Sequence, residues 1–413
     1  MTSKSLTVAS GRRARYELSM SPNAAPRHPA VARLGVQALR TSLIREVANA
    51  GLGRDDVLAF WFGESDQPTP AFIREAAARA LTDGRTFYTH NLGRADLRDA
   101  LSGYLTRLHA TPIGVERLAV TSSGVNALML AAQAIMEPGD RVAVVTPVWP
   151  NVAEIPRIMG AHVAPVSLEP RNGRWSLDLD RLLDALTPGT RAVFINSPNN
   201  PTGWTLDAEA RQAILDHCRR LGIWILADDV YERLSFGPAA SAPSFLPLAD
   251  PEERLISINS FSKAWRMTGW RLGWMVAPPS LMDALGVLLE YNTSCAPDFV
   301  QEGAVAALTD GEPHIAAIRA ELAAARNQVL TGLRALPGIE APEPDGGMYA
   351  FFRLAGCEDS FTLAKTLVTE AALGLAPGAA FGTEGEGWLR WCFAARPEKN
   401  AAGLERLAAY LGR

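Results

Sequence analysis

Short apolar runs of strand length alternate with helix-like segments through most of the chain, and this alternation restricts the fold more than any other feature. The apolar runs begin near residues 118, 142, 163, 192, 223, 255 and 272. Strands that alternate with helices form parallel sheets, because each helix carries the chain back across the sheet. Strands covered on both faces read as continuous apolar runs. The sequence therefore predicts an α/β fold with a mostly parallel central sheet flanked by helices.

The two ends of the chain predict a second, smaller α+β domain. Near the start, the pattern gives a helix-like run at residues 31–50 and a short apolar strand at 57–62. Near the end, it gives a long helix at 315–336, strands at 348–354 and 388–394, and a closing helix at 401–411. We therefore expect a small domain from residues 31–62 and 306–413, a large domain from residues 63–305, and an N-terminal arm over residues 1–30.

One lysine stands out in the most sharply patterned segment of the chain. Lys263 lies in Ser-Phe-Ser-Lys-Ala-Trp-Arg, directly after the apolar run at residue 255, and is one of only four lysines among 40 cationic side chains. Arginine stays protonated in proteins and cannot form an imine, whereas a desolvated lysine amine can. A surface lysine would also fit the count, but the aromatic surroundings favour an imine-forming amine.

An imine-forming lysine suggests pyridoxal phosphate (PLP), which needs an acid at its ring nitrogen and donors at its ring oxygen. Asp228 ends the apolar run at 223–227, and ligands bind at the carboxyl ends of parallel strands. Tyr231 follows and can return its hydroxyl to the same place. In Asn-Pro-Thr-Gly, Asn200 offers an amide that a ligand would satisfy. Each pattern alone also fits an ordinary turn or helix cap.

Three further segments supply the remaining parts of such a site. Ser123, Gly124 and Val125 stand between a strand and a helix, where backbone N–H groups and the helix dipole favour a phosphate, although a plain Ser cap has the same appearance. Trp149 follows another strand, and its indole could stack on the cofactor ring or pack in the hydrophobic core. Arg390 is a lone cation in an apolar strand, so it requires a carboxylate from a substrate or from an ion pair.

Together these motifs resemble those of the class I/II aminotransferases, PLP enzymes of fold type I, from about residue 34 to the C-terminus. The matching motifs are Ser-Phe-Ser-Lys, an arginine (Arg271) eight residues later, Asn-Pro-Thr-Gly, Asp-x-x-Tyr and the late strand arginine. The resemblance implies a transaminase in which PLP forms a Schiff base with Lys263.

The resemblance also implies a role for each site residue. Lys263, Asp228 and Tyr231 would be catalytic, and Asn200 would join Tyr231 at the ring oxygen. Arg390 would bind the substrate carboxylate, with Gly63, Asn200 and Trp149 beside the substrate. The phosphate would be bound by the following set: Ser123, Gly124, Val125, Ser260, Ser262 and Arg271.

The resemblance further implies a homodimer with shared active sites. Tyr88 matches the tyrosine that reaches the neighbouring subunit's phosphate, and residues 292–294 would reach across in the same way. Expected substrates are an amino acid and a 2-oxo acid. A PLP-dependent C–S β-lyase or a synthase of the same fold would use the same residues, and so would a non-catalytic sensor domain, although the intact Lys263 counts against the sensor.

Composition excludes several other classes of function. The net charge of −4 has interspersed signs, so neither nucleic acid nor a membrane surface is an expected partner. No apolar run approaches the length of about 18 residues that a membrane span needs. The four cysteines lack metal-ligand spacing, so no metal site is expected and a reduced, cytoplasmic setting fits.

The segment before Gly63 bears on the amino donor. It reads Phe60-Trp61-Phe62, and alternation along a strand sends Trp61 to the opposite face from its two neighbours. At least one aromatic ring should therefore point toward the substrate, which favours a donor with an aromatic or large apolar side chain. Packing at the domain junction is the competing interpretation.

Overall fold

The computed structural model describes residues 31–412, so the expected arm over residues 1–30 lies outside the described residues. The described residues divide into two units, residues 31–38 and residues 39–412. In the first, the described residues form one short helix, α1 (Leu34–Gln37). The prediction of a continuous helix over residues 31–50 is wrong, because α2 (Leu43–Ala50) starts separately, where the Ser42 hydroxyl accepts a hydrogen bond from Arg45 N (3.3 Å).

The second unit is built around a seven-stranded sheet in the order β2-β10-β9-β8-β7-β3-β4. Its strands are β2 (Leu118–Thr121), β3 (Arg141–Thr146), β4 (His162–Ser167), β7 (Thr190–Asn196), β8 (Trp224–Asp228), β9 (Leu255–Ser260) and β10 (Gly273–Val276). All seven predicted apolar runs belong to it. Strands β4, β3, β7, β8 and β9 pair in parallel, and β10 is antiparallel to both β9 and β2. The predicted mostly parallel sheet is therefore confirmed.

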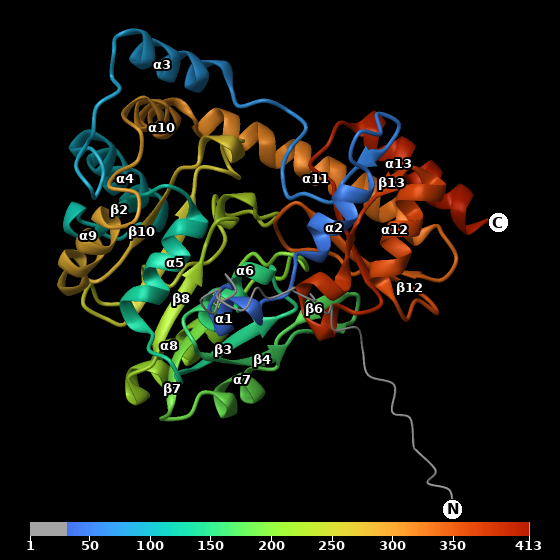
Figure 1. Cartoon of the computed structure of the whole chain (residues 1–413), viewed down its shortest axis with the longest axis horizontal. Coiled ribbons are helices and arrows are strands. Elements are labelled where there is room, and N and C mark those ends of the chain that lie inside the picture. Colours follow the sequence, from blue (N-terminus) through green and yellow to red (C-terminus); the bar gives the residue numbers. More distant parts are fainter. Residues whose placement is uncertain (1–30, 413) are drawn as a thin grey trace, which may run out of the picture. The chain divides into compact units, whose positions relative to one another are not determined.

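Helices cover both faces of this sheet, as Figure 1 shows. Alternate residues of β3 belong to different hydrophobic clusters: Val142 and Val144 to one, Ala143 and Val145 to the other. The helices of this region are α3 (Ala71–Thr82), α4 (Ala95–His109), α5 (Gly124–Ile135), α6 (Pro150–Ile158), α7 (Leu179–Ala185), α8 (Ala208–Leu221), α9 (Met282–Glu290) and α10 (Asp298–Asp310). Burial on both faces explains why the strands read as continuous apolar runs.

A smaller sheet comes from the last quarter of the chain, in the order β11-β12-β15-β14. Its strands are β11 (Ile339–Glu340), β12 (Tyr349–Leu354), β14 (Ala376–Pro377) and β15 (Trp388–Cys392), and the helices around it are α11 (Glu312–Arg334), α12 (Ser360–Ala371) and α13 (Pro397–Leu411). Near the start of the chain, β1 (Leu58–Ala59) pairs in parallel with β13 (Leu373–Gly374). Helix α2 packs against α12, so residues 43–50 and 360–371 lie side by side in this region (Figure 1).

The remaining elements are short. They are the hairpin β5 (Glu169–Arg171) and β6 (Arg174–Ser176), and the 3-10 turns η1 (Val115–Arg117), η2 (Glu232–Leu234), η3 (Thr268–Trp270), η4 (Pro279–Leu281), η5 (Gly378–Phe381) and η6 (Thr383–Gly385). No helix among residues 31–412 is long and apolar enough to cross a membrane.

The sheet topology determines where a ligand can bind. Strand β4 lies on one side of β3 and β7 on the other, so the direction of the strand connections reverses at β3. Ligands of open α/β sheets bind beyond the carboxyl ends of the strands at such a reversal. The segments that follow β3 and β7 carry Trp149 and Asn200, and Asp228 is the last residue of β8; the sequence singled out all three.

Candidate active site

A cavity of about 690 Å³ lies beyond the carboxyl ends of the central strands. All but two of the predicted site residues line it: Gly63, Gly124, Val125, Trp149, Asn200, Asp228, Tyr231, Ser260, Ser262, Lys263, Arg271 and Arg390. The two that do not are Ser123 and Tyr88. Residues separated by more than 300 positions in the sequence, such as Gly63 and Arg390, thus line the same cavity, and Arg390 of β15 reaches Asn200, which follows β7.

Lys263 lies three residues beyond β9, and its Nζ donates a hydrogen bond to the carbonyl oxygen of Gly63 (2.6 Å). Burial lowers the pKa of the Lys263 amine to about 8, and the guanidinium groups of Arg390 and Arg271 act in the same direction. A lysine with this pKa is partly neutral near neutral pH. The neutral amine is the form that attacks a carbonyl carbon.

Asp228 is the last residue of β8 and is buried. Burial raises the pKa of its carboxyl group to about 7, and the adjacent Asp229 acts in the same direction. The backbone N–H of Val230 donates to Oδ1 at 3.4 Å, and among the described residues Asp228 forms no ion pair. A buried carboxylate without a cation is unfavourable, so the site favours a ligand that presents a positive N–H at this position.

Arg390 is 2 % exposed and contacts the site through several groups. One terminal nitrogen donates to Asn200 Oδ1 (2.8 Å) and the other to the carbonyl oxygen of Trp61, while Nε has no hydrogen-bond partner among the described residues. The ring centroids of Tyr349 and Phe381 lie 4.5 and 4.9 Å from the guanidinium carbon. No carboxylate of the described residues pairs with it, so a buried cation remains available for a carboxylate ligand.

The N-terminus of α5 forms another part of the cavity wall. The Ser123 hydroxyl accepts from Asn126 N (3.0 Å), so its side chain caps the helix rather than lining the cavity. Gly124 and Val125 begin the first turn and do line it. A Cβ at Gly273 would lie 2.7 Å from Gly124 N, so a glycine lets β10 lie against this turn. Backbone N–H groups at a helix start favour an anion.

Serine and arginine side chains line the cavity together with the first turn of α5. Ser260 Oγ donates to Ser262 Oγ (2.9 Å), and Arg271 donates to the carbonyl oxygen of Thr268 (2.6 Å) while remaining exposed. Residues 292–294 were expected to reach a partner subunit. Within this chain, Asn292 accepts from Asn126 Nδ2 (2.7 Å) and Ser122 Oγ donates to Thr293 Oγ1 (3.1 Å), and the contact with a partner stays a prediction.

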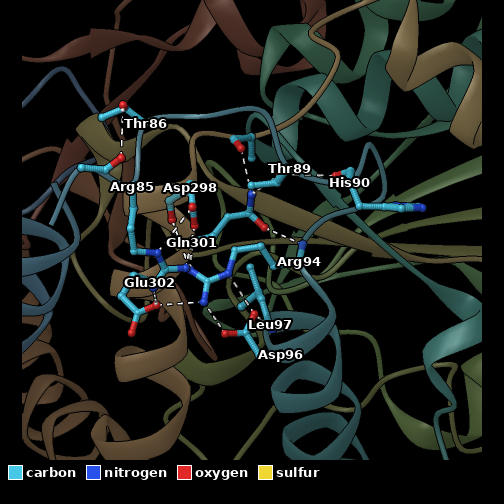
Figure 2. A network of polar contacts seen from close by, with 12 residues as sticks. Arg85, Thr86, Thr89, His90, Arg94, Asp96, Leu97, Asp298, Gln301 and Glu302 are labelled. Carbon is cyan, nitrogen blue, oxygen red and sulfur yellow. Dashed lines mark hydrogen bonds and ion pairs between the residues drawn. The ribbon is translucent and has the colours of Figure 1, made fainter.

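Tyr88 lies away from this chain's own cavity and is 90 % exposed, next to Phe87 at 81 %. The loop that carries both rings is held by an ionic network, which Figure 2 shows. Arg85 and Arg94 both donate to Asp298 Oδ1 (2.8 and 2.9 Å), and both pair with Glu302 (2.5 and 2.9 Å). A loop flanked by these ion pairs therefore presents two aromatic rings at the surface of this chain.

The aromatic segment before Gly63 divides between core and cavity. Phe60 packs on Trp391 with ring centroids 4.5 Å apart, and Trp61 covers Gly374, where a Cβ would lie 2.1 Å from the ring. Trp61 is 8 % exposed at the cavity wall, whereas Phe62 is only partly buried there. The guanidinium carbon of Arg45 lies 4.9 Å from the centroid of the Phe62 ring.

Comparison with known proteins identifies the family. The family model described as aminotransferase class I and II matches residues 55–407. The chain belongs to this family. It is 34 % identical to aspartate aminotransferase of Pyrococcus horikoshii over 90 % of this chain and 95 % of that protein.

Two solved structures of aminotransferases are similar to this one. An aromatic aminotransferase from Pyrococcus horikoshii superposes with a TM-score of 0.82 at 30 % identity, covering 89 % of this chain and 98 % of that one. An aspartate aminotransferase from Thermus thermophilus with maleate gives a TM-score of 0.85 at 32 % identity, covering 92 % and 100 %. The aminotransferase is thus of fold type I, as the sequence predicted.

Members of this family depend on PLP, and the chain is a PLP-dependent aminotransferase that transfers an amino group from an amino acid to a 2-oxo acid. The cavity fits the cofactor. Its wall contains a carboxylate that forms no ion pair among the described residues, the start of a helix, and a lysine amine. Among residues 31–412, no group of three or more His, Cys, Asp or Glu could hold a metal ion.

Sequence reasoning missed one residue at the centre of this aminotransferase's site. Tyr349 lines the cavity, and its hydroxyl lies 2.6 Å from the hydroxyl of Tyr231. It begins the apolar strand β12 (YAFFRL), so no turn or charge pattern draws attention to it. A usable signal was the Gly-Gly pair just before, because Gly346 and Gly347 let the strand enter the site closely.

Proposed function

We propose that the aminotransferase carries PLP on Lys263 and uses the same amine to move the proton at the substrate's α-carbon. The observation that carries this proposal is the amine itself, with a pKa of about 8, in one cavity with Asp228. Bound PLP supplies an electron sink that stabilises negative charge at that carbon. Once free, the Lys263 amine is a base of suitable strength to take the proton and later to return it.

In this proposal the other side chains hold and orient the reactants. Asp228 keeps the ring nitrogen protonated, and its lack of an ion pair supports this role. Asn200 and Tyr231 donate to the ring oxygen. Trp149 covers one face of the ring and lies beside the substrate. The phosphate is bound by Ser123, Gly124, Val125, Ser260, Ser262 and Arg271, of which Ser123 acts by fixing the first turn of α5.

Arg390 binds the α-carboxylate of every substrate, and Gly63 leaves room beside it. Its burial, its free Nε and its contact with Asn200 support this role, since a guanidinium held by neutral acceptors retains its charge for the ligand. A half-reaction tests the function. Adding a single amino acid to the holoenzyme should convert the bound cofactor to its amine form. The absorbance of the cofactor should then change, and no ammonia should be released. Stoichiometric ammonia release would instead indicate an eliminating enzyme.

The active unit in this proposal is a homodimer, and Tyr88 serves the phosphate of the partner's site. The exposed pair Phe87 and Tyr88, on a loop fixed by ion pairs, supports a second copy as the occupant of this surface. An exposed pair of large aromatic rings is unfavourable in a monomer.

Hybrid dimers test the shared site. A dimer of Lys263→Ala with Tyr88→Ala contains one complete site if Tyr88 acts across the interface. The matched control places both substitutions in one chain and pairs it with the wild type, so that no site is complete. The first hybrid should exceed the control in activity. Equal activities, or full activity in a demonstrated monomer, would contradict the shared site.

The preferred donor carries an aromatic or large apolar side chain. Phe62 at the cavity wall supports this, while Phe60 belongs to the core. The cation of Arg45 beside Phe62 favours a second candidate, a donor with a distal carboxylate. The values of kcat/KM for phenylalanine, tyrosine, leucine, aspartate and alanine decide between them. Phe62→Ala should reduce kcat/KM for the aromatic donors. Arg45→Gln should reduce kcat/KM for aspartate only if the second candidate is correct.

The proposal also covers the domain boundaries and the cellular compartment of the enzyme. The small domain comprises residues 31–62 and 306–413 and the large domain residues 63–305, which the pairing of β1 with β13 supports. The enzyme acts in the cytoplasm, a placement supported by its four free cysteines, since thiols persist in a reducing compartment. Limited proteolysis with mass spectrometry, and thiol labelling in intact cells, test these two statements.

A further inference from the structure

Tyr349 joins two groups that have separate roles in the proposed function. It is fully buried at the start of β12, and its hydroxyl lies 2.6 Å from that of Tyr231. The centroid of its ring lies 4.5 Å from the guanidinium carbon of Arg390. One side chain therefore contacts both the donor to the cofactor's ring oxygen and the cation for the substrate carboxylate.

The hydrogen bond between the two hydroxyls has a direction once a ligand is bound. Each phenol has one proton, and burial raises the pKa of both Tyr231 and Tyr349, so both stay protonated near neutral pH. Asn200 Nδ2 also donates toward the Tyr231 oxygen, at 3.5 Å. If Tyr231 donates its proton to the ring oxygen, Tyr349 must donate to Tyr231. Bonds in such a chain polarise and strengthen one another.

The chain leaves space for this arrangement at Gly63. A Cβ at that position would lie 2.0 Å from the Tyr349 hydroxyl, so any side chain there would displace it. The carbonyl oxygen of the same glycine accepts a hydrogen bond from the Lys263 amine. The position of the Tyr349 hydroxyl is thus fixed from the Lys263 side as well.

We propose that Tyr349 is a positioning residue that strengthens Tyr231 as a donor to the cofactor's ring oxygen and holds Arg390 in place for the substrate carboxylate. The inference rests on the proposed placement of Tyr231 and Arg390. The hydroxyl performs the first task and the ring performs the second, so substitutions can separate them. Tyr349→Phe removes only the hydroxyl, and Tyr349→Leu removes the ring that faces Arg390.

The main readout is the pH titration of the absorbance of the bound cofactor, measured on the holoenzyme without substrate. The ring oxygen accepts either from Tyr231 or from the protonated nitrogen that joins the cofactor to Lys263. A weaker Tyr231 donor favours the protonated nitrogen, so Tyr349→Phe should raise the midpoint by a few tenths of a pH unit. Tyr231→Phe should raise it further. The double variant should match Tyr231→Phe alone, because Tyr349 acts through Tyr231.

The control is Tyr104→Phe, which removes another buried tyrosine hydroxyl, one that accepts a hydrogen bond from Arg233 elsewhere in the fold. It should leave the midpoint unchanged. In the second arm, KM for several unrelated 2-oxo acids should stay within about twofold in Tyr349→Phe and rise together, about tenfold or more, in Tyr349→Leu. If Tyr349→Leu does not fold, the Phe variants alone decide.

The outcomes separate this inference from the function on which it rests. A midpoint that moves in Tyr231→Phe but not in Tyr349→Phe overturns the inference and leaves the site assignment intact. Additive shifts in the double variant overturn it too, because Tyr349 would then act independently of Tyr231. If neither variant moves the midpoint, the placement of Tyr231 fails and the inference fails with it.

Discussion

Replacing Arg390 with lysine removes the planar fork of the guanidinium but keeps a positive charge. In the structure, the two terminal nitrogens are held by Asn200 and by the carbonyl oxygen of Trp61, and Nε is free. The group also lies against two aromatic rings, so these contacts hold it in place before a substrate arrives. A lysine ammonium in the same space binds as a point charge without that plane.

The expected loss follows from the number of bonds. A bidentate pair makes two charge-assisted hydrogen bonds with a carboxylate, and lysine retains one. Each bond to a charged group contributes about 1.5–3 kcal/mol. With about 1.4 kcal/mol for each factor of ten, kcat/KM should fall about 10- to 150-fold. The fall should be similar for every amino donor and every 2-oxo acid, since all share the α-carboxylate.

The assay compares kcat/KM for five donors and two acceptors in the wild type and in Arg390→Lys. Arg353→Lys is a matched control, because Arg353 lies on the neighbouring strand β12, is about half exposed and pairs with Glu340 away from the cavity. Its kinetics should stay within about twofold of the wild type. A loss confined to one substrate in Arg390→Lys would refute the reasoning and assign Arg390 to a side-chain pocket.

Three further predictions concern other parts of the site. The rate at which the apoenzyme recaptures PLP should rise with pH around a midpoint of about 8, because burial lowers the pKa of Lys263 and only the neutral amine reacts; a midpoint near 10.5, the ordinary value, would contradict this. Ser123→Ala should lower the free energy of unfolding by about 1 kcal/mol in urea titrations, since it removes the cap of α5, and an unchanged value would exclude the cap. Gly63→Ala should cost about 1–3 kcal/mol in the same assay, because its Cβ meets Tyr349, whereas Gly189→Ala has open space and should be nearly neutral.

The fold was predictable where a strand's environment is uniform. All seven apolar runs became strands of one sheet, because a strand covered on both faces needs apolar residues at every position. Strand direction was less accessible: β10 is antiparallel, and nothing in its four residues encodes that. The two-residue pairing of β1 with β13 joins positions more than 300 residues apart, a contact that local pattern does not reveal.

The candidate site was predictable where chemistry required unusual residues in turns. Lys263 and Asn200 follow strands, Asp228 ends one, and all three line one cavity, as expected from their positions. The helix break before Ser42 was missed because residues 31–50 keep a helix-like composition across it. Tyr349 was missed because a tyrosine in an apolar strand is usually core. Its role depends on Tyr231 and Arg390, which the folded chain brings to it.

The most direct test of the account is to locate the covalent link between protein and cofactor. Borohydride reduction of the purified holoenzyme, followed by proteolysis and mass spectrometry, converts an imine into a stable tag on a single lysine. We predict the tag on the peptide that contains Lys263, and its absence in Lys263→Arg, which cannot form an imine. A tag on Lys365 or Lys399, or no tag on the wild type, would contradict the assignment of Lys263.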